Sequence, residues 1–598
     1  MVTGIRPTFV PYDAGEPGYN TDWNNVAPNV GIAWRPRVEE GFLRTLMGDP
    51  EQATFRAGYS LAYNREGMAL YTGVIGGNPG STIPATRSAT LGNLVGPGES
   101  WPVLLRDESR LGLAPIPDSP VYPIVATVAN DIRIFHPDIQ MSGAHSLAVS
   151  FQRALSQDMA VEVRYVGTWG RHQWSQQDFN GNCTVGSLGN PCPNINMVEN
   201  GFLDEFKLAQ ANLQANLAAG RGGTFRYYGP GTSTSPLPIF LAYFSGVPAA
   251  QAGESARYTS TLFSNSSIVS YLAANYPQPY NLASDNATYG LFGNATRRAN
   301  AIAAGLPENF FIVNPNVDNA YVYQDTGFTD YNALQIDLRR RLSRGLQFTF
   351  NYQYAVGYVQ EYLGERYGYE SQPRLTVPRH AFKTTWNWNI PVGRGQRFGA
   401  DMNKWLDGFV GGWEFHGAGR FQNRLMDMGN VRLVGMSLDE LQDAYTIREV
   451  TDANGVKRVY ILPDDIILNT QRAFNVSATS ATGYSALGVP EGRYIAPANG
   501  AGCIQIKAGD CAPRQQVVFA PWFTRFDISV AKRFPIHGTM NFEIRLDVMN
   551  VFNNINFTPV ANPGPAANIF EVTSAYTDNS NTFDPGGRLG QLAFRFNW

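Results

Sequence analysis

The feature that most constrains this chain is the alternation of large apolar and polar side chains, residue by residue. In residues 345–357 (GLQFTFNYQYAVG), Leu346, Phe348 and Phe350 fall on one face, and Gln347 and Thr349 fall on the other. A period of two residues is the signature of a β-strand with two different faces. The same alternation occurs in eleven segments: 27–38, 55–63, 146–152, 161–165, 334–339, 345–357, 382–390, 413–421, 525–530, 541–551 and 589–598. We therefore expect an all-β fold.

The two faces of these strands differ more than burial in a soluble protein requires. Phe542, Ile544 and Leu546 alternate with Glu543 and Arg545, so an aromatic and aliphatic face opposes a face with both signs of charge. In a transmembrane barrel the apolar face meets lipid and the polar face lines the lumen. A soluble propeller is the alternative, but its repeat of about 40–45 residues is not visible here. The pattern predicts a transmembrane antiparallel β-barrel.

The connections between these strands alternate between short and long, as in outer-membrane barrels with short periplasmic turns and long extracellular loops. We treat residues 1–598 as one barrel domain that carries two large loop regions. The first, 170–331, is an insertion with a predicted helix near 201–219, where Phe202 and Phe206 begin an apolar stripe. This stripe indicates either a helix packed on its own loop or a ligand-gripping element. The second loop region is 423–522.

Strand direction leads to a further expectation about the chain. The strand at 27–38 precedes a connection that we assign to the periplasm, and the last strand, 589–598, also runs toward the periplasm. A single-chain barrel with both termini in the periplasm has an even number of strands, whereas the alternation predicts eleven. The N-terminus also lacks the charged and apolar regions of a signal peptide. We therefore expect a partial barrel that lacks N-terminal strands.

Composition excludes several classes of protein. Charged residues are 16% and aromatic residues 13% of the chain, and the net charge of −3 gives no basis for nucleic-acid binding. No run of roughly 20 apolar residues is present, as a membrane-spanning helix would need. The four cysteines form two local pairs, Cys183 with Cys192 and Cys503 with Cys511. Two small disulfide-closed loops in an oxidising compartment are our interpretation, with unpaired thiols as the alternative and no zinc-finger spacing.

Catalytic signatures are missing from the sequence. None of the six histidines lies in an HExxH motif, and neither a GxSxG elbow nor a phosphate-binding loop occurs. Glu543 and Arg545 could belong to the site of a barrel enzyme, but a polar lumen wall requires such residues in any case. The aromatic loop residues could bind sugars or peptides, or simply pack within the loop: Tyr227, Tyr228, Phe240, Tyr243 and Phe244. We predict no enzyme activity, no cofactor and no metal site.

Several segments resemble one family of outer-membrane proteins. The C-terminal LGQLAFRFNW resembles the signal read by the barrel assembly machinery, with Leu592, Phe594, Phe596 and Trp598 on one face. Residues 525–557 (RFDISVAKRFPIHGTMNFEIRLDVMNVFNNINF) resemble the penultimate hairpin of TonB-dependent receptors. The large Oar-like receptors, which begin with a carboxypeptidase-regulatory-like domain, are the most similar type. Their mid-barrel strands resemble three further segments: NNVAPNVGIAWRP, ATFRAGYSLAYNR and DYNALQIDLRRRLSRGLQFTFNYQYA.

This resemblance implies a location, a set of partners and a function. The location is the bacterial outer membrane, and the partners are outer-membrane lipid, the barrel assembly machinery and the TonB complex. The function is uptake of a large solute such as a glycan, a peptide or a siderophore. Receptors of this family contain a plug and a barrel of about 22 strands. Neither the plug nor the TonB-contacting segment is recognisable here, so the resemblance implies a fragment. A structural or adhesive barrel is the alternative function.

Overall fold

The structure is a computed structural model of the 598-residue chain. It describes residues 6–598, apart from 12, 14, 66–67, 83–85, 105, 113–118, 128–129, 181–198, 270–289, 292, 363–368, 453, 478, 481, 499–508, 510, 539 and 576–585.

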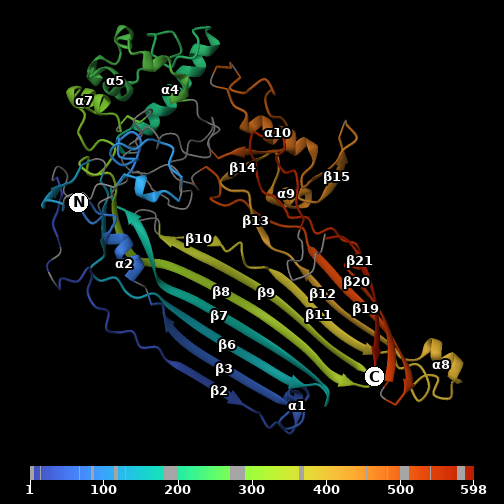
Figure 1. The fold of residues 1–598 in the computed structure, drawn as a ribbon. Coiled ribbons are helices and arrows are strands. Elements are labelled where there is room, and N and C mark those ends of the chain that lie inside the picture. The colour runs from blue at the N-terminus through green and yellow to red at the C-terminus, as the bar shows by residue number, and fades with distance from the viewer. Residues whose placement is uncertain are drawn as a thin grey trace.

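One large β-sheet dominates the described part of the chain (Figure 1). Its main path runs through eleven strands, each antiparallel to its neighbours, from β2 at one edge to β21 at the other. These are the eleven segments that the alternation predicts. They are β2 (Asn29–Trp34), β3 (Ala53–Tyr63), β6 (Gly143–Ala154), β7 (Met159–Asp178), β8 (Ala320–Ser343), β9 (Leu346–Tyr362), β11 (His380–Asn389), β12 (Trp413–Gln422), β19 (Phe523–His537), β20 (Met540–Met549) and β21 (Leu589–Asn597).

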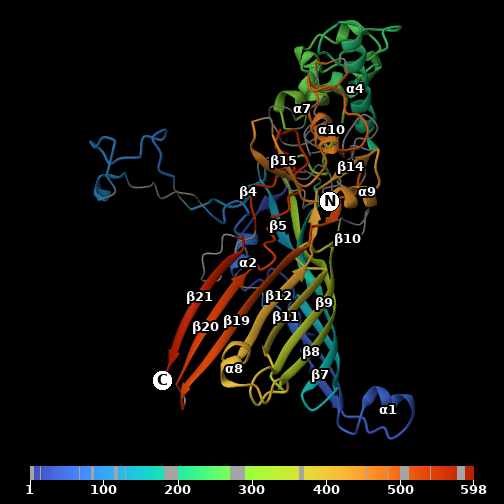
Figure 2. The ribbon, with the colours of Figure 1, turned by 90° about the vertical axis from the view of Figure 1, so that its right-hand side faces the viewer.

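The sheet does not close on itself within the described residues. β2 and β21 end the path and do not pair with each other there. β5 (Ile132–Phe135) pairs parallel with β8, and β10 (Tyr369–Pro373) pairs with β9, beside the main path. Figure 2 shows the sheet as a curved wall with the strands strongly inclined.

The register keeps each of the two predicted faces continuous across neighbouring strands. Phe151 lies opposite Phe55 and Val163, whereas Ser150 lies opposite Arg56 and Arg164. Large apolar side chains on the first face are exposed to the surroundings of the protein, among them Ile32 (67% exposed) and Phe594 (62%). A solvent-exposed apolar band of this kind is typical of a surface that meets lipid. We call the two surfaces the apolar face and the polar face.

The two ends of the sheet differ in their connections. At one end, the turn end, β6 joins β7 through Leu155–Asp158, and β8 joins β9 through Arg344 and Gly345. Both residues of that second turn have positive φ, 51° and 77°, as a two-residue hairpin turn requires. At the other end, the loop end, the long connections fold into separate clusters. Figure 1 places these clusters together, at the opposite end from the C-terminus.

The first loop cluster lies between β7 and β8 and has its own apolar core. It contains α4 (Phe202–Ala218), α5 (Pro238–Ser245) and α7 (Ala295–Ala303). Phe202, Phe206 and Phe240 are fully buried in it, and the Phe202 ring contacts the other two. Short 3-10 helices complete the cluster: η2 (Ala249–Gln251), η3 (Ser255–Arg257), η4 (Thr261–Ser264) and η5 (Ser266–Ile268).

The second loop cluster lies between β12 and β19 and packs with residues 557–572 of the β20–β21 connection. Its core includes Leu441, Ile466 and Phe570. Three two-stranded sheets and two helices build it: β13 (Leu425–Asp427) with β18 (Val517–Phe519), β14 (Val431–Val434) with β17 (Tyr494–Pro497), β15 (Arg448–Thr451) with β16 (Lys457–Tyr460), α9 (Leu438–Ala444) and α10 (Asp464–Phe474).

The remaining elements lie in the first quarter of the chain and in one connection at the turn end. They are β1 (Thr8–Phe9), α1 (Gly41–Met47), α2 (Met68–Ile75), η1 (Glu108–Arg110), β4 (Ile124–Val125) and α8 (Lys404–Val410). No helix in the described part of the chain has the length and apolarity to span a membrane.

The loops differ from the sequence expectation in two ways. β7 and β8 continue as a paired ribbon to Asp178 and from Ala320, well into the stretch 170–331 that the sequence suggests is irregular. Polar side chains such as those of Gln173 and Thr329 bond across this ribbon and replace the apolar alternation there. The loop regions also contain several helices, whereas the sequence pattern indicates only one.

Candidate functional site

Two charged areas of the polar face, one toward each end of the sheet, border cavities. Both areas lie on β11, β12, β19 and β20. The cavity nearer the turn end has a volume of about 750 Å³, and the cavity nearer the loop end about 710 Å³. These volumes fall in the range of small-molecule binding sites.

The area near the turn end is a wall of paired charges. Arg533 on β19 lies 3.1 Å from Glu414 on β12 and 2.8 Å from Glu543 on β20, measured between nitrogen and oxygen atoms. On β20, Arg545 lies 3.0 Å from Asp547. Opposite charges therefore alternate along and across the strands and neutralise one another. Glu543 and Arg545, which the sequence presents as either a catalytic pair or a lumen wall, belong to this ion-pair wall.

The area near the loop end has a different charge balance. Lys383, Arg420 and Arg525 occupy directly opposed positions on β11, β12 and β19. Like charges directly opposite each other in a sheet destabilise it. Asp527 compensates Arg525 at 3.1 Å. Within the described residues, the charge of Lys383 has no carboxylate partner. We call these three residues the cationic row.

The side chain of Arg420 is held by partners that do not cancel its charge. The guanidinium of Arg420 donates to Gln422 at 2.9 Å and lies 5.5 Å from the centre of the Phe523 ring. An aromatic face and an amide oxygen orient the guanidinium but leave its positive charge in place. Lys383 is exposed toward the cavity that all three residues line. This arrangement is suited to an anionic group.

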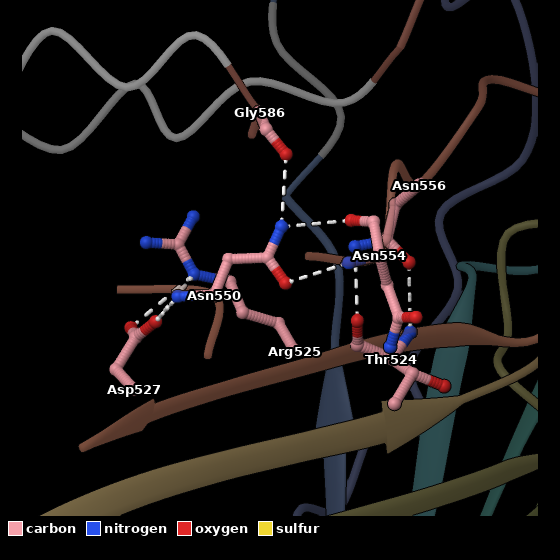
Figure 3. A network of polar contacts seen from close by, with 7 residues as sticks. All are labelled: Thr524, Arg525, Asp527, Asn550, Asn554, Asn556 and Gly586. Atoms are coloured by element: carbon pink, nitrogen blue, oxygen red, sulfur yellow. Dashed lines mark hydrogen bonds and ion pairs between the residues drawn. The ribbon is translucent and has the colours of Figure 1, made fainter. Parts of the chain in front are cut away.

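A network of asparagines forms the rim of this cavity (Figure 3). Asn550, at the end of β20, adopts a left-handed conformation with φ 49°. Its side chain donates to the carbonyl oxygens of Asn554 (2.8 Å) and Gly586 (2.9 Å) and accepts from the backbone N–H of Asn554. Its own backbone N–H donates to Asp527 at 2.8 Å. The turn after β20 therefore holds the carboxylate that binds Arg525.

Asn556 joins the same turn to β19. Its side chain accepts from the backbone N–H of Thr524 and donates to the carbonyl of Thr524, at 2.9 and 3.0 Å. This reciprocal pair places the start of β19 beside the turn, as Figure 3 shows. Both asparagines belong to the phrase NVFNNINF, on which the family resemblance partly rests. The structure gives that phrase a physical role in fixing the rim of the cavity.

None of the described residues that the sequence suggests for particular roles lines this cavity. Leu592, Phe594, Phe596 and Trp598 lie on the apolar face at the edge strand or just beyond its end, and all four are exposed. Cys511 is disulfide-bonded. Cys183, Cys192 and Cys503 lie outside the described residues. In the part of the chain that the structure describes, no group of three His, Cys, Asp or Glu side chains could hold a metal ion.

The loop aromatics are packed rather than presented to a ligand. Phe240, Tyr243 and Phe244 on α5 are buried in the first loop cluster, as is Tyr227. Tyr228 lies under the guanidinium groups of Arg221 and Arg226. Packing within the loop, one of the two interpretations of these residues, accounts for their positions.

A buried carboxylate ties α4 to α5 in this cluster. Glu205 on α4 accepts hydrogen bonds from the backbone N–H groups of Ile239 and Phe240, both at 2.8 Å, at the N-terminus of α5. The side chain thereby caps a helix to which it does not belong. Burial raises the pKa of Glu205 to about 7, against the opposing effect of the two hydrogen bonds.

Sequence reasoning missed the cationic row because its three residues come from three strands whose register the sequence does not show. One signal was available. Lys383, Arg420 and Arg525 each occupy a polar-face position within three residues of the loop end of a predicted strand. Aligning the predicted strands at their loop ends, rather than at their tight turns, would have placed these three residues beside one another.

Comparison with known structures gives low overall similarity. The outer-membrane transporter YddB of Escherichia coli has 8% identity and a TM-score of 0.29, with 91% of this chain and 38% of that chain covered. The ferripyoverdine receptor of Pseudomonas aeruginosa has 6% identity and a TM-score of 0.28, with 90% and 30% covered. The ferric enterobactin receptor PfeA of the same organism has 8% and 0.28, with 95% and 40% covered. The chain thus spans well under half the length of these structures.

No curated protein matches the chain. The family model of the outer membrane beta barrel domain, in contrast, matches residues 4–591, nearly the whole chain. This match agrees with the antiparallel sheet, its exposed apolar face and its polar face. The chain is an outer-membrane protein and belongs to the outer membrane β-barrel domain family.

Proposed function

We propose that this chain is the C-terminal barrel portion of an Oar-like TonB-dependent receptor, and that the receptor takes up a large solute with anionic groups. The observation that carries the proposal is the net positive charge of the cationic row, which contains Lys383 and Arg420 in addition to the Arg525–Asp527 pair. The row lines a cavity of about 710 Å³ at the loop end of the polar face. The resemblance of residues 525–557 to receptor hairpins supports the assignment to this type.

The orientation follows from the general build of outer-membrane barrels, in which long loops face the exterior. The loop end then faces the medium, and the cationic row lies on the lumen wall directly below the loops. A solute entering between the two loop clusters would meet Lys383 and Arg420 first. Positive charge focused in a recessed site raises the local concentration of an anionic ligand. The proposed solute is an acidic glycan, an acidic peptide or a ferric catecholate siderophore.

The ion-pair wall has a separate role in this proposal. Its charges already neutralise one another, so it offers a polar surface without a strong field at the turn end of the lumen. We assign it to contact with a plug encoded upstream of Met1. The N-terminal region of the intact receptor would contact the TonB complex. Residues 592–598 would present the signal for the barrel assembly machinery, and the two cysteine pairs would close small loops on the oxidised side of the membrane.

The direct test of the cationic row uses three labelled probes: a sialylated oligosaccharide, an acidic peptide and a ferric tricatecholate. Equilibrium binding is measured on outer-membrane fractions that contain the wild-type chain or the K383Q/R420Q double variant. We expect wild type to bind at least one probe, and the double variant to bind it at least tenfold more weakly. K457Q is the matched control, since Lys457 is an exposed lysine of the second loop cluster. Equal binding by both chains would contradict the assignment.

Transport and fragment status need separate tests. In-frame DNA upstream of the Met1 codon that encodes a signal peptide and a plug would support the receptor assignment. A stop codon followed by a genuine start site would contradict it. With the complete receptor, accumulation of the bound probe that an uncoupler abolishes would support energised uptake. Binding without accumulation would favour the alternative, a surface barrel whose folded loop clusters bind other molecules.

A further inference from the structure

Two connections at the turn end contain short helices with exposed apolar side chains. α8 lies between β11 and β12, and α1 lies between β2 and β3. Trp405 and Phe409 of α8 are 85% and 74% exposed, and Phe42 of α1 is 80% exposed. Figures 1 and 2 both place the two helices at the end of the sheet opposite the loop clusters. Large aromatic residues with this exposure are unusual on a water-facing connection.

The chain holds α8 against the apolar side of the sheet. The indole N–H of Trp413, on the apolar face of β12, donates to the carbonyl of Phe409 at 2.9 Å. Lys532, on the apolar face of β19, donates to the carbonyl of Gly411 just after the helix. The ammonium of Lys532 also lies 5.4 Å from the centre of the Trp413 ring. α8 therefore continues the apolar face beyond the ends of the strands.

α1 is held in the same way by a different strand. The guanidinium of Arg153 donates to the carbonyls of Thr45 and Leu46, at 2.7 and 2.8 Å, near the C-terminus of the helix. Arg153 lies on the apolar face of β6, two residues after Phe151. In both connections a cation on the apolar face thus binds carbonyls at the C-terminal end of a helix, where the helix dipole favours positive charge. Because the same contact holds both helices, we infer that α1 and α8 have the same role.

The β11–β12 connection also has charges suited to a membrane surface. Residues 390–412 contain the basic residues Arg394, Arg397 and Lys404 and the acidic residues Asp401 and Asp407. Asp407 accepts a hydrogen bond from the backbone N–H of Arg394 at 2.7 Å, which folds the connection back on the helix. Basic side chains beside exposed Trp and Phe are typical of helices that lie in a lipid headgroup region.

We propose that α8 and α1 are interfacial helices that rest in the phospholipid headgroup layer at the turn end of the barrel. Trp405 and Phe409 enter the acyl boundary, and Lys404 and Arg397 contact phosphate groups. The continuity of α8 with the lipid-facing band argues for lipid rather than for a second copy or a periplasmic protein. The pair of helices fixes the depth of the partial barrel from the periplasmic side.

The test places a fluorescent bimane label at Gly408, where an added Cβ meets no atom within 4 Å. The G408C chain keeps Trp405 and Phe409 intact. Labelled outer-membrane fractions are titrated with aqueous iodide and with stearic acid carrying a nitroxide near its carboxylate or near its chain end. G590C on the apolar face of β21 and G253C in the first loop cluster are the lipid and water controls, since Gly590 and Gly253 are also open.

We expect the label at 408 to be quenched at least threefold more strongly by the shallow nitroxide than by iodide or by the deep nitroxide. In a G408C chain that also carries W405S and F409S, iodide should quench the label more strongly than the shallow nitroxide does. Quenching like that of G253C would overturn the proposal. Protection from every quencher would overturn it as well, because the helix would then be covered by protein.

Discussion

The indole of Trp386 on β11 covers Gly417, its directly opposed neighbour on β12, so closely that a Cβ at position 417 would lie 2.1 Å from the ring. The Phe526 ring covers Gly419 from the other side, where a Cβ would lie at 2.4 Å. Glycine on β12 thus makes room for aromatic rings from both neighbouring strands. Such pairs of aromatic residues with glycine help to fix the register of a sheet.

Replacing Gly417 with Ala should destabilise the sheet, because the indole of Trp386 must leave its position. Overpacking of this kind costs about 1–3 kcal/mol. The measurement is the temperature at which the heat-modifiable gel band shifts in outer-membrane fractions. Gly590→Ala, on the same face of β21 and open to space, should leave that temperature nearly unchanged. Equal effects of both substitutions would contradict the packing described.

Replacing Asn550 with Ala should weaken the rim of the cationic cavity. The substitution removes the side-chain bonds to Asn554 and Gly586 and places Ala at φ 49°. We expect a loss of about 2–4 kcal/mol. Asn550→Gly loses the same bonds but accepts the positive φ, so it should recover about 1 kcal/mol of that loss.

The control for this rim is Asn597→Ala, which removes one hydrogen bond of 2.8 Å to Asn541 in an ordinary strand pair. Its expected cost is about 1 kcal/mol. All three chains are compared by urea unfolding in lipid vesicles. A result in which the Gly variant is no more stable than the Ala variant would show that the left-handed conformation of Asn550 carries no cost.

The first loop cluster should lose stability as pH rises. Burial raises the folded-state pKa of Glu205 to about 7 from the ordinary value of 4.5. Between these values the folded state binds more protons than the unfolded state, so its stability falls as pH increases through this window. Above about pH 7 the loss is complete, and below about pH 4.5 the contribution is fully present.

Hydrogen exchange of residues 238–245, corrected for the intrinsic pH dependence of exchange, measures this effect. Wild type should show decreasing protection of α5 from pH 5 to pH 7. Glu205→Gln keeps an acceptor oxygen but does not titrate, so its protection should be flat over the same range. Protection that rises with pH in the wild type would refute the assignment.

The strands of the sheet were predictable because alternation is a local property. In each strand, such as β9 or β20, the residues of the strand itself show which side chains share a face. The tight turns at Leu155–Asp158 and Arg344–Gly345 are likewise indicated by their own residues. The order of the strands in the sheet was predictable as well. Among the eleven strands of the main path, each pairs with the strand before it and the strand after it along the chain. The family resemblance rests on the same local patterns.

The loops and the site were less predictable, for physical reasons. α5 (PIFLAYFS) is apolar on all sides, so it has no helical stripe to detect. α8 has only seven residues, too few to show a helical periodicity in the sequence. The cationic row depends on the register between three strands, which is set by pairing over long distances. Glu205 meets the N-terminus of α5 only because the loop folds on its own core.

A spin-label scan of β20 in outer-membrane fractions shows whether one face of the sheet lies in lipid and the other in a lumen. Single cysteines replace residues 541–549 in turn, and each nitroxide is exposed to oxygen, which concentrates in lipid, or to a water-soluble nickel complex. We predict that the accessibility of the labels alternates along the strand. Labels at Phe542, Ile544, Leu546 and Val548 should respond mainly to oxygen, and labels at Glu543, Arg545 and Asp547 mainly to nickel. Uniform access along the strand would contradict a sheet with one face in lipid and one in a lumen.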